Sequence, residues 1–131
     1  MNPLRPLERL AAQSPPLTFD AADAFVAAPG WGLLVLSGDA SQRPEAQDLA
    51  VVVQELKGRA PQGSRVGVVT DADEVKVKAY FQVPALPALL LLRDGKVLSR
   101  IPKLQEWAVY SRAADVLWGA RRPAPAPEVT P

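Results

Sequence analysis

The pattern of apolar and polar positions predicts helices and strands that alternate along the first half of the chain. Apolar residues recur at helical spacing in 17–29 and again in 44–57. Between them, 31–37 is a nearly unbroken apolar run, which is typical of a strand buried on both faces. A second short strand is expected at 65–70. This order favours a parallel βαβ crossover.

The second half of the chain predicts a hairpin between two helices. A short helix is expected within 71–81 and a longer one over 104–118. The leucine run 89–92 has Pro87 shortly before it and Asp94-Gly95 shortly after it, and Asp-Gly is a favoured pair in a type I′ hairpin turn. We therefore expect an antiparallel pair that joins the parallel strands in one mixed sheet, with helices on both faces.

Proline divides the chain into a central domain and two ends. The 131 residues include 14 prolines, and eight of these lie before residue 17 or after residue 122. We expect a proline-containing N-terminal segment over 1–16, a domain over 17–120, and a disordered Pro/Ala-rich tail over 121–131. A domain of about a hundred residues is large enough to bury a hydrophobic core.

Composition removes several classes of chemistry. The chain has no cysteine and no histidine, which excludes thiol nucleophiles, disulfides, Cys/His metal sites and imidazole acid–base catalysis. No metal cluster, phosphate loop or nucleophile–base pair stands out, so we expect a protein that is not an enzyme and has no cofactor. A net charge of +1 gives no nucleic-acid signature. Apolar runs too short to span a bilayer, and a start unlike a signal peptide, predict a cytoplasmic location.

Charge is unevenly distributed along the chain. Residues 1–56 contain seven acids and three bases, whereas residues 57–131 contain seven acids and twelve bases. Three of the acids, Asp39, Glu45 and Asp48, cluster around the start of the second predicted helix. Glu45 and Asp48 are three residues apart, which makes them neighbours on a helix face. Two roles are open for this pair: complementing the positive end of the helix dipole, or binding a cationic partner.

The order of the elements resembles the thioredoxin fold, a three-layer α/β/α sandwich with a mixed central sheet. The strongest match is the stretch 81–96, FQVPALPALLLLRDGK. In thioredoxins this pattern holds a cis-proline before a strand and an Asn/Asp-Gly turn after it, so Pro87 is the candidate cis-proline and Leu86 borders the peptide groove. Where thioredoxins carry Cys-x-x-Cys, residues 41–44 read Ser-Gln-Arg-Pro, so thiol–disulfide exchange is chemically excluded.

A narrower resemblance lies in residues 38–56, GDASQRPEAQDLAVVVQEL. This stretch is similar to the pattern G-D-x-x-x-x-P-E-x-x-D-x-A-V-x-x-x-E-L of the hydrogenase expression/formation proteins called HupG, HoxO or HyaE. Members of this family are thioredoxin-like and lack a working Cys-x-x-Cys. The resemblance implies a redox-inactive cytoplasmic chaperone for an uptake nickel–iron hydrogenase. Such a chaperone binds the small-subunit precursor through its twin-arginine signal peptide before export.

The resemblance makes Asp39, Glu45, Asp48 and Leu86 the candidate partner-binding residues. Carboxylates hold arginine side chains in a bidentate geometry that lysine cannot copy. Main-chain pairing at a strand edge would hold an extended segment with little regard to its sequence. Other hydrogenase maturation proteins are further expected partners, whereas nucleic acid and stable membrane insertion are not expected. The alternative is a non-catalytic scaffolding module that binds a folded hydrogenase subunit or another maturation protein.

Overall fold

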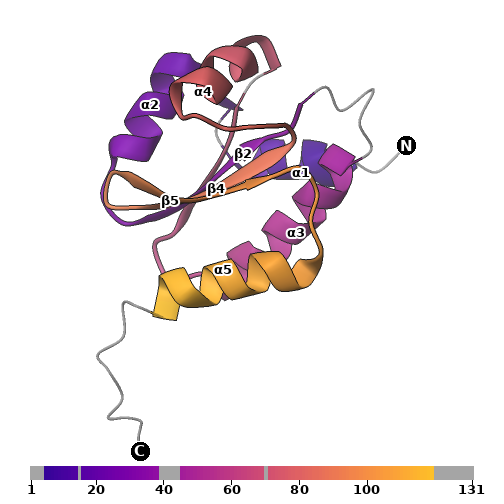
Figure 1. Ribbon diagram of the computed structural model, residues 1–131, viewed down its shortest axis with the longest axis vertical. Helices are drawn as coiled ribbons and strands as arrows, with labels where there is room; N and C mark the ends of the chain where they lie inside the picture. The colour runs from indigo at the N-terminus through magenta and orange to yellow at the C-terminus, as the bar shows by residue number, and fades with distance from the viewer. Residues whose placement is uncertain (1–4, 15, 39–44, 70, 120–131) are drawn as a thin grey trace, which may run out of the picture.

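One mixed sheet forms the centre of the molecule (Figure 1). The computed structural model describes residues 5–14, 16–38, 45–69 and 71–119. In these residues the strand order across the sheet is β1-β3-β2-β4-β5, in which β3 pairs in parallel with β1 and β2, and β4 pairs antiparallel with β2 and β5. The strands are β1 (Pro16–Leu17), β2 (Trp31–Leu36), β3 (Arg65–Val69), β4 (Ala88–Arg93) and β5 (Lys96–Pro102).

Helices cover both faces of the sheet, which confirms the predicted three-layer thioredoxin-like α/β fold. The helices are α1 (Pro6–Gln13), α2 (Phe19–Ala27), α3 (Glu45–Arg59), α4 (Glu74–Tyr80) and α5 (Trp107–Gly119), with a 3₁₀ turn at Asp71–Asp73 before α4. Helices α2 and α4 lie on one face, and α1, α3 and α5 lie on the other (Figure 1).

The apolar runs of β2 and β4 are explained by burial on both faces. Successive side chains of a strand point to opposite faces of its sheet. Leu33 and Leu91 therefore join the core under α1, α3 and α5, whereas their neighbours Leu34 and Leu90 join the core under α2 and α4. All four side chains are at most 1% exposed. The two central strands thus hold the two cores together.

The hairpin between β4 and β5 has the predicted turn. Asp94 and Gly95 both have positive φ, +49° and +87°, as a type I′ turn requires. The turn is also attached to the start of β2, because Asp94 exchanges two hydrogen bonds with Gly30. The Gly30 N–H donates to Asp94 Oδ1 at 2.7 Å, and the Asp94 N–H donates to the Gly30 carbonyl at 2.9 Å.

The domain boundary predicted at residue 17 falls inside the packed unit. Helix α1 buries Leu7 and Leu10 in the core that it shares with α3 and α5, and β1 pairs with β3. Proline at the start of α1 is compatible with a helix, because the first turn has no intrahelical partner for its N–H groups. The predicted tail over 121–131 lies outside the described residues.

The connection from β5 to α5 is fixed by a buried tyrosine. Tyr110 is fully buried, and its hydroxyl accepts a hydrogen bond from the Gln105 N–H at 3.0 Å and donates to the Lys103 carbonyl at 3.3 Å. Burial raises the pKa of this hydroxyl, and the hydrogen bond from Gln105 opposes the shift.

Candidate functional site

The candidate site surrounds the end of β2. Ser37 and Gly38 follow the strand and are both buried. Residues 39–44, which include the candidate Asp39 and the Ser-Gln-Arg-Pro stretch at 41–44, lie outside the described residues. Helix α3 begins directly after them at Glu45.

The two remaining candidate acids are exposed in the first turn of α3. Glu45 and Asp48 are neighbours on the helix surface because they are three residues apart. Within the described ranges, neither carboxylate has a hydrogen bond or an ion pair. The pair is therefore available to a cationic ligand, and its place at the positive end of the helix dipole is also favourable.

Gln47, which lies between these acids in the sequence, contacts α1. Its Oε1 accepts a hydrogen bond from the Leu7 N–H at 2.8 Å, and its Nε2 donates to Glu8 Oε2 at 3.3 Å. The first N–H groups of a helix have no partner within it, and the side chain of Arg5 does not cap α1. Gln47 thus supplies the missing cap. Sequence reasoning missed it because its partners lie about 40 residues away.

A buried carboxylate holds the end of β2 in place. Glu74, the first residue of α4, is 4% exposed and accepts a hydrogen bond from the Gly38 N–H at 2.8 Å. The Ser37 hydroxyl lies 3.1 Å from both Glu74 Oε2 and the Gly38 carbonyl. Glu74 therefore fixes the direction in which the chain leaves the sheet toward residue 39. Sequence reasoning did not single it out, because an acid in the first turn of a helix is usually exposed.

The loop before β4 reaches the same end of the sheet. The peptide bond between Leu86 and Pro87 is cis, the isomer that the resemblance to thioredoxins predicts. Ala88 is paired with Leu36, so Pro87 lies next to the segment that leaves β2. Leu86 is partly buried and packs against the core under α2 and α4. The loop and α3 therefore flank the end of β2 from the two faces of the sheet.

The described part of the chain contains no group of three or more His, Cys, Asp or Glu residues that could hold a metal ion. Among its helices, none has both the length and the apolar character needed to cross a membrane.

Relatives of known description match most of the chain. The family model described as hydrogenase-1 expression protein HyaE matches residues 7–110. The hydrogenase expression/formation protein HupG of Rhizobium leguminosarum bv. viciae is 38% identical over 92 residues, which cover 67% of this chain and 62% of that protein. HupG of Rhodobacter capsulatus is 33% identical over 94 residues, covering 71% and 68%. HoxO of Cupriavidus necator is 34% identical over 95 residues, covering 71% and 59%.

The chain spans less than two thirds of the length of some of these relatives, including the HupG of Rhizobium leguminosarum bv. viciae and the HoxO. Among solved structures, a mutant thioredoxin from Halobacterium salinarum NRC-1 superposes with a TM-score of 0.65 over 84% of this chain and 91% of that one. At 16% identity, this likeness shows the fold alone. The family match and the relatives above 30% identity show that the chain belongs to the family of hydrogenase expression/formation proteins that includes HyaE, HupG and HoxO.

Proposed function

We propose that this chain is a redox-inactive chaperone in the maturation of an uptake nickel–iron hydrogenase. In this proposal it binds the small-subunit precursor through the twin-arginine signal peptide, in the cytoplasm, before export. The names of its relatives support a role in hydrogenase formation. The lack of cysteine supports binding in place of catalysis, because a thioredoxin fold without thiols cannot exchange disulfides.

The observation that carries the proposal is the pair of exposed carboxylates on α3. Glu45 and Asp48 lie one helix turn apart and have no partner among the described side chains. Each carboxylate can take one guanidinium group in a bidentate geometry, so two adjacent arginines match the pair. Asp39, which lies outside the described residues, is proposed as a third partner-binding acid.

The apolar part of the signal peptide would lie along the loop before β4. Leu86 is partly buried beside Pro87, close to the end of β2. A peptide whose arginines contact the first turn of α3 would cross this end of the sheet and bring its apolar residues to Leu86. Glu74 supports this surface indirectly by holding Gly38.

The test is a titration of a labelled signal peptide with the wild type and a double charge reversal, Glu45→Lys with Asp48→Lys. Because both acids are exposed, the variant should keep its fold and bind at least about tenfold more weakly, a loss of about 1.4 kcal/mol. The matched control is Asp20→Lys with Asp23→Lys, which reverses two exposed acids with the same spacing on α2. Equal weakening by both double variants would show a general charge effect and remove Glu45 and Asp48 from the site.

A second titration separates the proposal from the scaffolding alternative. The signal peptide alone should bind, and replacing both of its arginines by lysine should weaken binding, because lysine lacks the bidentate fork. Binding that requires the folded hydrogenase subunit, and that survives removal of the signal peptide, would contradict the chaperone proposal and favour the scaffold.

A further inference from the structure

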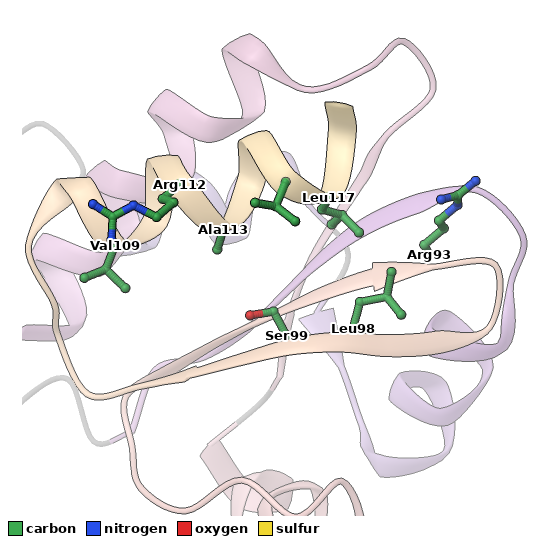
Figure 2. A pocket seen from close by; sticks show the side chains of 8 residues that line it. Arg93, Leu98, Ser99, Val109, Arg112, Ala113 and Leu117 are labelled. Carbon is green, nitrogen blue, oxygen red and sulfur yellow. The ribbon is translucent and has the colours of Figure 1, made fainter. Parts of the chain in front are cut away.

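A groove of about 550 Å³ lies between β5 and α5. Leu98 and Ser99 of β5 face α5 across the groove, and Val109 and Val116 of α5 also line it (Figure 2). Arg112 lies at the Val109 end of the groove, whereas Arg93 lies at the opposite end (Figure 2). The residues of this groove differ from those proposed to bind the signal peptide.

The groove brings together three exposed apolar side chains. In the described chain, Leu98 is 47% exposed, Val109 40% and Val116 71%. These are three of the seven large hydrophobic residues that are exposed in the described chain. A cluster of exposed apolar residues marks an interaction site more often than scattered ones do.

A β-bulge adds one of these side chains to the groove. Leu91 pairs with Ser99 and Leu92 with Val97, so Leu98 is the extra residue in β5. Val97 packs against the core under α2 and α4, whereas both Leu98 and Ser99 line the groove on the α5 side. A bulge interrupts the pairing of two strands and redirects a side chain. Here it brings an apolar side chain to the groove.

The backbone of β5 is open along the groove. β5 is the last strand in the order of the described sheet, and it pairs only with β4. An edge strand presents unpaired N–H and C=O groups that can pair with an added strand. An extended segment added there would direct alternate side chains toward α5.

The charge at the groove favours an anionic occupant. Arg112 is exposed. Among the described residues it has no hydrogen-bond or ion-pair partner, and it forms no ion pair with Asp115 on the next turn of α5. Arg93 is already partly compensated, because its Nε lies 3.6 Å from Asp94 Oδ2 and its guanidinium lies 4.8 Å from the centre of the Trp31 ring. The uncompensated positive charge is therefore at the Arg112 end.

We propose that this groove binds an extended segment of a partner protein in which apolar side chains alternate with polar ones and a carboxylate lies at one end. The segment pairs with the free edge of β5, its apolar side chains pack between Leu98 and Val116, and its carboxylate pairs with Arg112. This docking site is distinct from the proposed signal-peptide site, because it takes an anionic segment in place of a cationic one.

The test uses two capped heptapeptides in which valine and threonine alternate, one with glutamate at both ends and one with lysine at both ends. Each is titrated into the full ¹⁵N-labelled chain while the amide resonances are followed. We expect shifts confined to β5 and α5, and binding of the glutamate peptide at least about tenfold tighter, which corresponds to about 1.4 kcal/mol. Equal affinities, or shifts confined to other elements, would overturn the proposal.

Two variants and two controls complete the test. Val116→Asp should weaken binding of the glutamate peptide, and Arg112→Glu should reverse the preference toward the lysine peptide. Val75→Asp and Lys76→Glu are the matched controls, because both residues are exposed on α4 on the other face of the sheet. Controls that weaken binding as strongly would contradict the proposal.

A second copy of the chain is the competing occupant. Sedimentation that shows a dimer lost in Val116→Asp would assign the groove to self-association and overturn the proposal. Failure of the signal-peptide titration with Glu45→Lys and Asp48→Lys would leave these results unchanged, so the two proposals fail separately.

Discussion

Gly67 of β3 shows how closely Leu17 of β1 and Phe25 of α2 pack around this strand. A Cβ atom at this position would lie 2.5 Å from Leu17 Cδ1 and 3.2 Å from the Phe25 ring. Gly67→Ala is therefore expected to lower the free energy of unfolding by about 1–3 kcal/mol, the usual cost of an overpacked core. Chemical denaturation measures this change.

Gly58 provides the control for that substitution. It lies inside α3, where an added Cβ would meet no atom within 4 Å. Gly58→Ala should raise the free energy of unfolding by about 0.5–1 kcal/mol, since alanine loses less backbone entropy in a helix. Equal effects of the two substitutions would contradict the packing described around Gly67.

Glu74 is expected to contribute to stability through the hydrogen bonds that it accepts. Glu74→Ala leaves the buried Gly38 N–H without this acceptor and should cost about 1–3 kcal/mol. Glu74→Gln keeps an acceptor oxygen and should cost less. Urea denaturation gives the stabilities, and exchange of the Gly38 amide should accelerate in the alanine variant. Glu55→Ala on the exposed side of α3 is the control, expected within about 0.5 kcal/mol of the wild type.

Single residues were predictable from the sequence where their role depends on local spacing. The helical spacing placed Glu45 and Asp48 next to each other on one helix face, because three residues nearly complete a helix turn. Gln47 and Glu74 were not predictable in this way. Their hydrogen-bond partners lie about 40 and 36 residues away, so only the folded chain brings them together.

At the scale of elements, the sequence identified every strand and α-helix of the described chain except β1 and α1. The Asp-Gly turn and the apolar runs marked β2, β4 and the hairpin, because turn chemistry and burial on both faces leave local patterns. Helix α1 was missed. It has eight residues, and a helix this short is marginal in water without tertiary contacts. Helix α1 is stabilised by its contacts with α3, and the local sequence does not reveal these contacts.

Leu10 tests whether α1 belongs to the cooperative domain. Leu10 is fully buried in the core that α1 shares with α3, so Leu10→Ala should lower the free energy of unfolding by about 2–5 kcal/mol. Leu98→Ala makes the same change at a half-exposed position of β5 and should stay within about 0.5 kcal/mol of the wild type. An N-terminal segment that is independent of the domain would give no loss for Leu10→Ala, as judged by thermal or urea denaturation.

For the whole molecule, the absence of histidine and cysteine leaves alkaline pH as a sensitive range. The pKa of Tyr110 is raised above its ordinary value of 10.0, first of all by burial. The folded chain therefore keeps the phenol proton at pH values where the unfolded chain has lost it. The contribution of Tyr110 to stability is complete below about pH 10 and decreases as pH rises through the folded-state pKa.

Tyr110→Phe checks this dependence. The variant should be less stable near neutral pH, because the Gln105 N–H loses its acceptor, but its stability should fall less steeply above about pH 10. Tyr80→Phe, which removes an exposed hydroxyl, is the control. Parallel alkaline profiles for the wild type and Tyr110→Phe would rule out this role of Tyr110. The measurement is urea denaturation across the alkaline range.

The fold and the family were predictable at the scale of the molecule, because the order of elements and two local motifs carry them. The groove between β5 and α5 was not. It depends on a bulge that redirects Leu98 and on the position of α5 relative to the sheet edge, and neither has a signature in the order of residues.

The first turn of α3 has a consequence for the coupling between ligand binding and local unfolding. Glu45 and Asp48 point to solvent from the same turn in which Gln47 caps α1. A ligand that stabilises this turn therefore also stabilises the docked state of α1, by thermodynamic linkage. Ligand binding at the two carboxylates would therefore slow hydrogen exchange of the α1 amides, although α1 itself does not contact the ligand.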